Sequence, residues 1–330
     1  MISYLLKPFG AYDLQNRIFE SPYKYLRLSL QKRGVDLQTY DQGDLRKAEK
    51  VLCFNHSRSF YNECKRAGLR REQLVLFLME PRVVIPSQYT PETWEKYGLI
   101  FTFLDNLVDG LHILHMRYPQ GQTLLEHVPS WEERQFLMLM NANKYSYVTH
   151  ELYTLRRKAI AYFENNSDFH LYGHGWNNNG TLNTHAALQA ILYGQPHRYF
   201  VDLCRGFKHS TAYQGAVTDK YSILQKYRFC LAFENEDQTQ GWISEKLFDC
   251  LFTGIVPVYL GAKNITDVIP NECFIDFREF PSFEKLEQFL RNMTAQTWLN
   301  YQQAGQAFIR SAAFAPWLPQ NTFPAVAEKL

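Results

Sequence analysis

The chain has 330 residues, of which 46% are hydrophobic and 21% are charged, values typical of a soluble globular protein rather than a disordered chain or a membrane bundle. The chain has 35 Lys and Arg against 33 Asp and Glu, so it lacks the large positive net charge that is typical of a nucleic-acid-binding protein. Any anionic ligand must therefore be bound by a local cluster of basic residues. At this length we expect two domains rather than one.

The six cysteines are scattered without a C-x-x-C pair, and several lie in apolar runs. We therefore expect reduced, buried thiols of a cytosolic protein rather than zinc ligands or a disulfide framework. The N-terminal MISYLLKPFGAY has neither a basic start nor a long apolar run, which predicts a first strand rather than a signal peptide. The sequence also contains no apolar run of about 18 residues, the length that a spanning helix needs.

In the first half, short apolar runs alternate with polar stretches of helical composition, the pattern of a parallel sheet with crossover helices. The predicted helices cover Ser21–Arg33 and Arg58–Gly68. The predicted strands are Ile2–Leu6, Val51–Asn55, Leu74–Met79 and Leu99–Leu104. Glu80 directly follows the third strand, and a carboxylate at that end of a strand in an α/β fold points into the ligand crevice. The alternative is an ordinary surface acid.

A second series of elements begins at the strand Phe136–Asn141 and is the clearer one. The stretch His150–Asn165 places Leu152, Leu155, Ala159 and Phe163 on one helical face. Further strands are predicted at His170–Gly173, Arg228–Phe233, Ile255–Leu260 and Cys273–Asp276, and further helices at Ser244–Phe252, Ser282–Met293 and Ala295–Ala313.

The pattern breaks near residues 125–135, at VPSWEER. We therefore expect an α/β protein with two Rossmann-like domains, 1–130 and 131–330, with the last helix packing back on the first. Such halves would face a cleft with a nucleotide on one side and an acceptor on the other. Composition alone leaves a single large sheet as the alternative.

The most specific segment is YRFCLAFENEDQTQGWISEKLFDCLFTGIVPVYLGA, residues 227–262. Ser244 suits the N-cap of the following helix, whose unpaired N–H groups and partial positive charge favour a pyrophosphate. Lys246 lies in the first turn, where a cation opposes the helix dipole unless an anion is bound. Gly254 is a suitable helix stop. By spacing alone, a solvated Glu–Lys helix start is equally acceptable.

The same segment resembles the donor-binding motif of the α-1,3/4-fucosyltransferase family, here YRFCLAFEN, WISEK and GIVPVYLG. The resemblance covers about thirty-five residues and implies two Rossmann-like domains of the GT-B type. It also implies that Lys246 contacts the diphosphate of GDP-fucose, that Glu245 contacts the ribose or fucose, and that Asn235 and Trp242 line the pocket. Trp242 stands where tyrosine is common, and a core aromatic is the alternative.

Upstream, NKYSYVTHELYTLRRKAIAYFE and LYGHGW resemble the opening of the family's donor domain. The resemblance implies that an arginine of the first helix reaches the phosphates. The apolar spacing favours Arg156, although Arg157 remains a candidate, and without the resemblance both would be read as a solvated face. Asn143 and Gly173 in these segments are further donor-site candidates.

For the first half, the resemblance implies that Glu80 is the general base of an inverting transfer, in which GDP leaves as an acceptor hydroxyl attacks. The acceptor would be an oligosaccharide or glycoconjugate with an N-acetylglucosamine or glucose unit, and His56, Arg58 and Tyr61 are candidate contacts. The alternatives are another nucleotide-sugar donor and a non-catalytic carbohydrate-binding paralogue.

We expect no obligatory metal or other cofactor, since His/Cys ligand spacing and a D-x-D motif are both missing from the sequence; a divalent ion would at most stimulate. The acidic run Glu234, Glu236 and Asp237 is interpreted as a solvated loop. A cytoplasmic protein, with peripheral association with the inner face of a bacterial membrane as an option, is the expected setting.

Overall fold

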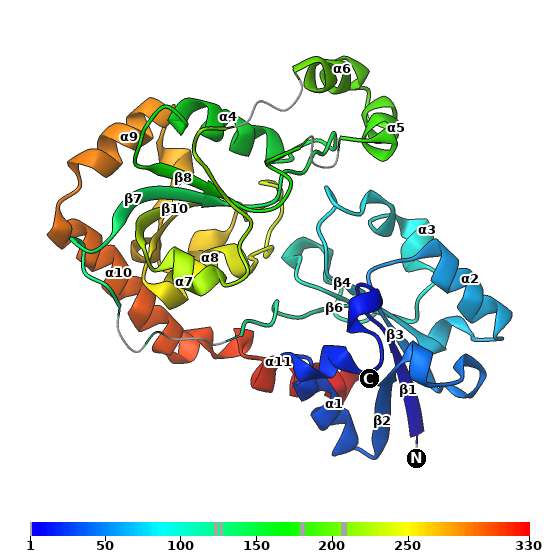
Figure 1. Ribbon diagram of the computed structural model, residues 1–330. Coiled ribbons are helices and arrows are strands. Elements are labelled where there is room, and N and C mark those ends of the chain that lie inside the picture. Colours follow the sequence, from blue (N-terminus) through cyan, green and yellow to red (C-terminus); the bar gives the residue numbers. More distant parts are fainter. Residues whose placement is uncertain (1, 122–124, 126–127, 179–181, 206–209) are drawn as a thin grey trace. The chain divides into compact units, whose positions relative to one another are not determined.

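The computed structural model describes residues 2–121, 125, 128–178, 182–205 and 210–330 (Figure 1). The chain divides into two compact units. The first unit comprises Met1–Gln122 and Phe314–Leu330, and the second unit comprises Thr123–Ala313. Each is built on its own parallel sheet of six strands, as expected for paired Rossmann-like domains.

The sheet of the first unit has the strand order β2-β1-β3-β4-β5-β6. Its strands are β1 (Ile2–Lys7), β2 (Val35–Thr39), β3 (Lys50–Phe54), β4 (Leu74–Leu78), β5 (Leu99–Thr102) and β6 (Ile113–His115). Its helices are α1 (Lys24–Gln31), α2 (Arg58–Arg66), α3 (Pro91–Trp94) and α11 (Pro319–Lys329). β4 is buried along its whole length, which explains its unbroken apolar sequence LVLFL.

The C-terminal helix belongs to the first unit although it is far from it in sequence. α11 packs against α1, and the Tyr4 hydroxyl donates to the Leu330 carbonyl over 3.1 Å. The long helix α10 (Ala295–Arg310), in contrast, belongs to the second unit. The polypeptide therefore enters the second unit once and returns to the first at Phe314.

The sheet of the second unit has the strand order β12-β11-β10-β7-β8-β9. Its strands are β7 (Gln135–Met140), β8 (Phe169–Tyr172), β9 (Tyr213–Gly215), β10 (Tyr227–Phe233), β11 (Val256–Leu260) and β12 (Ile275–Asp276). Its other helices are α4 (Tyr153–Phe163), α5 (Thr184–Leu192), α6 (Pro196–Arg205), α7 (Lys220–Leu224), α8 (Glu245–Thr253) and α9 (Phe283–Asn292). The order reverses between β7 and β10, and crevices at such switch points, outside the carboxyl ends of the strands, bind ligands in this fold.

The expected central strands and the helices α2, α8 and α9 are confirmed to within two residues, but the short edge strands β2, β6 and β9 escaped prediction. β2 alternates buried Val35, Leu37 and Thr39 with half-exposed Asp36 and Gln38, so it lacks an apolar run. β6 and β9 have only three residues each, too few for a periodic pattern. The predicted helix Ala295–Ala313 ends three residues early, at Arg310.

Candidate functional site

The turn between β10 and α8 is organised around a buried carboxylate. Glu234, the residue after β10, is fully buried, and its two oxygens each accept a 2.7 Å hydrogen bond from Ser244, one from the backbone N–H and one from the hydroxyl. Ser244 is the N-cap of α8, as predicted, and Gly254 ends the helix with a left-handed φ of 67°. A protein carboxylate thus accepts from both the N–H and the hydroxyl of Ser244, at the helix start that the sequence had suggested for a pyrophosphate.

Lys246 carries the charge of this helix start. Its Nζ lies 3.1 Å from Ser244 Oγ, 3.3 Å from Glu245 Oε1 and 3.5 Å from Glu234 Oε2. Burial alone would lower the pKa of Lys246, but attraction to Glu245 and Glu234 outweighs it and the pKa is raised, so the ammonium stays protonated. The side chain is 21% exposed.

Glu245 is the most accessible of these acids, with 42% of its side chain exposed. Burial acts to raise its pKa, but the charge of Lys246 and a hydrogen bond from its own backbone N–H outweigh this, and the pKa is lowered. A carboxylate therefore stands beside the Lys246 ammonium at the mouth of the turn. The Glu245 carboxylate can accept hydrogen bonds from sugar hydroxyls, and the Lys246 ammonium can bind a phosphate. The pair therefore suits a sugar-phosphate ligand.

Arg156 joins α4 to the end of β10. It is only 2% exposed, and its Nη2 donates to the carbonyls of Phe233 and Glu234, both over 2.6 Å, and to Asn235 Oδ1 over 3.1 Å. Burial lowers the pKa of its guanidinium, against the opposing attraction of Tyr153 and nearby carboxylates. The helical spacing, which favoured Arg156 over Arg157 as the phosphate ligand, agrees with the position of Arg156 beside the buried face of α4, and the residue closes the turn that holds Glu234.

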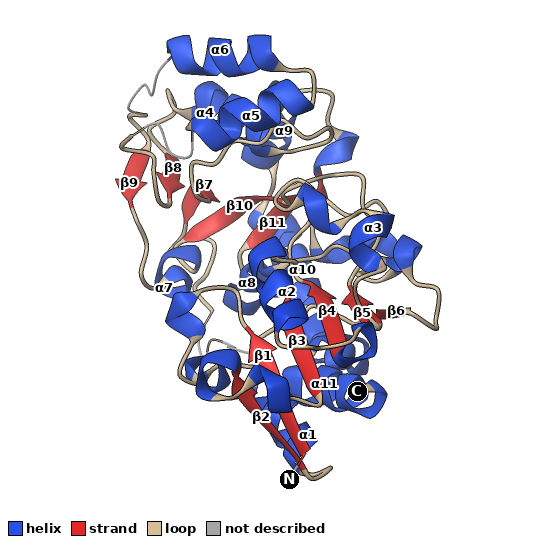
Figure 2. Ribbon diagram, turned by 90° about the vertical axis from the view of Figure 1, so that its right-hand side faces the viewer, coloured by secondary structure: helices blue, strands red, loops and turns tan. Residues whose placement is uncertain are grey.

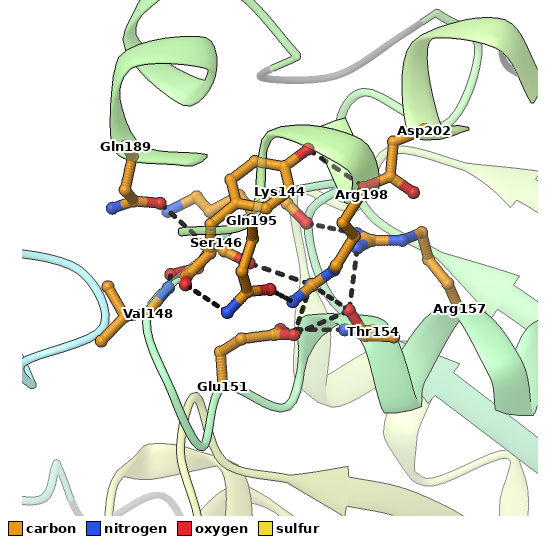
Figure 3. A network of polar contacts seen from close by, with 11 residues as sticks. Lys144, Ser146, Val148, Glu151, Thr154, Arg157, Gln189, Gln195, Arg198 and Asp202 are labelled. Carbon is orange, nitrogen blue, oxygen red and sulfur yellow. Dashed lines mark hydrogen bonds and ion pairs between the residues drawn. The ribbon is translucent and has the colours of Figure 1, made fainter. Parts of the chain in front are cut away.

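Arg157 points elsewhere, into a polar network between α4 and the α5–α6 pair (Figure 3). Its Nη1 donates to the Lys144 carbonyl over 2.7 Å, and its guanidinium lies 4.0 Å from the centre of the Tyr145 ring. Sequence reasoning missed the centre of this network, Arg198, whose Nη2 contacts Glu151 Oε1 at 2.5 Å. Its helix, PHRYFVDLCR, also contains His197 and Asp202, so no local pattern singles out Arg198.

The loops after β7 and β8 contain the remaining donor candidates. Asn143 is 2% exposed and donates through Nδ2 to the carbonyls of Gly175 (3.0 Å) and Asn178 (3.3 Å), while its buried Oδ1 accepts no hydrogen bond from the described residues. Gly173 has a φ of 129°, and a Cβ there would lie 2.0 Å from the Asn141 carbonyl oxygen. The close approach that requires glycine is therefore to the neighbouring loop of the same unit.

Trp242 and the acidic run are more buried than a solvated loop would be. Trp242 is 3% exposed, and Asn235 is half-buried where it accepts the bond from Arg156. The prediction of a solvated acidic loop was wrong for Glu234 and Glu236, which are 0% and 4% exposed, whereas Asp237 is partly exposed. Ser244 compensates the burial of Glu234 by supplying two donors, a partnership ten residues apart that composition does not reveal.

In the first unit, Glu80 follows β4 as predicted and its backbone is held on both sides. Asn55, at the end of β3 with a φ of 63°, accepts the Glu80 N–H through Oδ1 over 3.0 Å. The Glu80 carbonyl accepts from Gln88 Nε2 and from the Tyr89 hydroxyl, both over 2.7 Å. The residue as a whole is partly exposed. Glu80 therefore stands on a fixed main chain at a partly exposed position.

The three acceptor candidates line a single pocket of the first unit. This pocket has a volume of about 590 Å³ and is lined by His56, Arg58, Tyr61, Asn62, Ser87, Thr90, Glu92, Thr93 and Lys96. His56 Nδ1 lies 2.9 Å from the Tyr97 hydroxyl. Burial, followed by the charge of Lys96, lowers the pKa of His56 to about 4, so the ring is neutral near pH 7. Aromatic and hydrogen-bonding groups of this kind suit a sugar ring.

The residues thus gather in two sets. Asn143, Arg156, Asn235, Ser244, Glu245 and Lys246 lie at or beside the carboxyl ends of β7 and β10, and Glu80, His56, Arg58 and Tyr61 at those of β3 and β4. In the second set, Gln88 links His56 to Glu80: its Oε1 accepts the backbone N–H of His56 over 3.1 Å, and its Nε2 donates to the Glu80 carbonyl. Within the described part of the chain, His, Cys, Asp and Glu form no group of three or more able to hold a metal ion.

Comparison with known proteins finds a counterpart for part of the second unit. Residues 197–304 match the model of the glycosyltransferase family 10 (fucosyltransferase) C-terminal domain. An alpha-(1,4)-fucosyltransferase of Arabidopsis thaliana is 36% identical over 73 residues, 22% of this chain and 18% of that protein. GDP-fucose protein O-fucosyltransferase 3 of Danio rerio is 39% identical over 112 residues, 34% of this chain and 24% of that protein.

The matched segments therefore span a quarter or less of these relatives. A crystal structure of an alpha1,3-fucosyltransferase superposes with a TM-score of 0.60 at 12% identity, covering 99% of this chain and 89% of that one. The resemblance to fucosyltransferases and the GT-B fold class are thus confirmed. Among the helices in the described ranges, none has the length and apolar character to cross a membrane.

Proposed function

We propose that this chain, whose residues 197–304 match a family 10 fucosyltransferase domain, transfers L-fucose from GDP-fucose to a hydroxyl of an oligosaccharide acceptor. The observation that carries the proposal is Lys246 at the start of α8, within the matched segment, with a charged and partly exposed side chain. The acceptor we propose is an N-acetylglucosamine or glucose unit, joined in an α-1,3 or α-1,4 linkage.

Lys246 and the guanidinium of Arg156 or Arg157 would neutralise the charge that grows on the leaving diphosphate. Lys246 has the better-founded role, because it remains partly exposed while Arg156 is bound to the end of β10. A preorganised cation that meets charge developing in the transition state is among the larger contributions to catalysis. Glu245 would accept a hydrogen bond from a donor hydroxyl.

Glu80 would act as the general base. As the acceptor hydroxyl oxygen forms its bond to the anomeric carbon of fucose, the bond from that carbon to the β-phosphate oxygen breaks, GDP leaves and Glu80 takes the hydroxyl proton. One displacement of this kind inverts the anomeric configuration. The pinned backbone of Glu80 supports this role, since a base must be positioned before its pKa matters.

Calorimetric titration with GDP tests the donor half. Replacement of Lys246 by Met removes a charge-assisted contact of about 1.5–3 kcal/mol, so Kd should rise roughly ten- to 150-fold. Lys158→Met, which removes an exposed lysine of α4, is the matched control and should leave Kd unchanged. Equal affinities for the two variants would contradict the assignment. Stronger binding of UDP than of GDP would favour another nucleotide sugar.

Transfer assays test the catalytic half. Glu80→Gln should retain GDP binding and lose roughly 10²- to 10⁴-fold in transfer rate, while Glu95→Gln, an exposed acid of the same unit, should act like the parent. Equal rates for Glu80→Gln and the parent would reject the base. Neither transfer nor donor hydrolysis by the parent, despite GDP binding, would favour a non-catalytic carbohydrate-binding protein.

Two further assays concern the metal and the product. Because we propose that no metal is obligatory, a chelator should leave transfer largely intact, with divalent ions at most stimulatory. Linkage analysis of products from lactose and N-acetyllactosamine would assign the acceptor hydroxyl. We further propose a cytoplasmic location, on the basis of the free thiols of all six cysteines.

A further inference from the structure

The second unit has a helical hairpin on its outside, formed by α5 and α6. The two helices contact each other and lie beyond α4 (Figures 1 and 2). α5 buries only Ala186 and Ala190, which pack on Tyr147, and residues 196–204 of α6 include no fully buried one. Cys204 is consequently exposed, which corrects the expectation of buried thiols. The hairpin adds little to the core, so its purpose must lie in its polar contacts.

Arg198 of α6 is the centre of these polar contacts (Figure 3). Its Nη2 donates to Glu151 Oε1 over 2.5 Å and to the Ser146 carbonyl over 3.0 Å. The Glu151 side chain is only 5% exposed, and its carboxylate also accepts from the N–H and the hydroxyl of Thr154, over 3.0 and 2.7 Å. A buried carboxylate requires a cation and hydrogen-bond donors, and Arg198 supplies the cation.

The hairpin also binds the main chain of the loop that joins β7 to α4, residues 141–152. The Tyr147 N–H donates to Gln189 Oε1, and the Tyr147 carbonyl accepts from Gln195 Nε2, both over 2.9 Å. The Tyr147 hydroxyl donates to Asp202 Oδ2 over 3.0 Å. Because side chains satisfy main-chain groups that no strand or helix pairs, the loop is held in one conformation.

The far end of the same loop pairs with the turn that follows β10. Glu151 and Glu236 form an isolated antiparallel bridge, in which the Leu152 N–H donates to the Asn235 carbonyl over 2.9 Å. His150, directly before the bridge, has a φ of 69°, a conformation that costs energy for a residue other than glycine. Such a conformation persists only where neighbouring contacts enforce it, and Glu151 is the neighbour that Arg198 binds.

We propose that Arg198 is a positioning residue for the donor site. It fixes Glu151, and the bridge from Glu151 fixes the turn that carries Asn235 and leads to Glu245 and Lys246. This inference rests on the proposed binding of GDP-fucose at that turn. Without the Arg198 cation the Glu151 carboxylate turns to water, the bridge weakens, and only a fraction of the molecules presents the turn in the conformation that binds the donor.

Calorimetric titration with GDP tests this role. Arg198→Met should raise Kd about threefold to tenfold, the factor by which the binding-competent fraction falls. Arg198→Lys should recover much of the affinity, because an ammonium can still pair with Glu151. Arg291→Met is the matched control: it removes an arginine of α9 whose carboxylate partners, Asp168 (2.9 Å) and Glu287 (2.8 Å), lie outside the loop and the turn. Its Kd should equal that of the parent.

A double-mutant cycle tests whether Arg198 acts through Glu151. Glu151→Gln keeps the shape of the side chain and removes the charge, so it should raise the Kd for GDP by a similar factor. Arg198→Met/Glu151→Gln should bind about as well as either single variant, because both substitutions break the same contact. Effects that multiply in the double variant would show that the two residues act independently and would overturn the proposal.

Hydrogen exchange of the ligand-free proteins measures the coupling without GDP. Arg198→Met and Glu151→Gln should speed amide exchange in residues 144–152 and also in residues 235–237, whereas Arg291→Met should change neither. Faster exchange confined to the hairpin, a Kd for Arg198→Met equal to that of the parent, or an equal rise in Kd for Arg291→Met would each overturn the proposal. A parent that does not bind GDP would instead reject the proposed function, while the exchange data would still decide whether Arg198 holds the turn.

Discussion

The neighbouring residues Arg156 and Arg157 provide a sharp test of how the second unit is held together. They are adjacent on α4 and chemically identical, yet Arg156 is buried against the end of β10 and Arg157 is partly exposed. Replacing Arg156 by Lys keeps the charge but cannot reproduce the bonds from Nη2 to the carbonyls of Phe233 and Glu234. A buried acceptor left without its donor costs about 1–3 kcal/mol, so two such acceptors predict a loss of roughly 2–6 kcal/mol.

The corresponding loss for Arg157→Lys should be below about 1 kcal/mol, because a partly exposed carbonyl of Lys144 can turn to water. Urea unfolding followed by tryptophan fluorescence measures both values, and an unchanged m-value shows that the unfolded state is comparable. Equal losses for the two variants, or a larger loss for Arg157→Lys, would refute the structural role of Arg156. A large GDP-binding defect confined to Arg157→Lys would then identify Arg157 as the phosphate ligand.

Two other features give measurable outcomes. Gly173→Ala places a Cβ 2.0 Å from the Asn141 carbonyl oxygen and should lower the free energy of unfolding by more than about 3 kcal/mol. Gly194 also has a left-handed φ, 67°, but has open space around it, so Gly194→Ala should lower the free energy of unfolding by only about 1–2 kcal/mol. Similar losses for the two variants in urea unfolding would contradict this prediction. Burial, followed by the charge of Lys96, lowers the pKa of His56 to about 4, below the unfolded value of 6.5, so the unfolded chain binds the additional proton between these values. The free energy of unfolding should therefore fall as pH drops from about 6.5 to about 4, by on the order of 1–2 kcal/mol after solvent screening, and urea titrations of His56→Gln should show a flatter profile than the parent.

Much of the second unit could be predicted because its signals are local. Ser244 is a strong N-cap residue, Gly254 readily adopts a left-handed conformation, and the apolar run before Glu234 marks a buried strand. The spacing on α4 similarly placed Arg156 on the buried side. Each of these inferences depends on residues within one or two helical turns of one another.

The errors arose where a residue's partner is distant in sequence. Acidic side chains are usually exposed, so Glu234 was expected in solvent, but Ser244 supplies two donors that make its burial tolerable. Arg198 and Glu151 are 47 residues apart, and no local pattern relates them.

Gln88 couples the proposed acceptor pocket to the proposed base. It is completely buried, and its side-chain amide receives the His56 N–H at one end and donates to the Glu80 carbonyl at the other. A carboxylate could not satisfy both neighbours, and an aliphatic side chain could satisfy neither. Changes that reshape the pocket around His56 will therefore be transmitted to the main chain of Glu80, the proposed base, so that selectivity and turnover should drift together among natural variants.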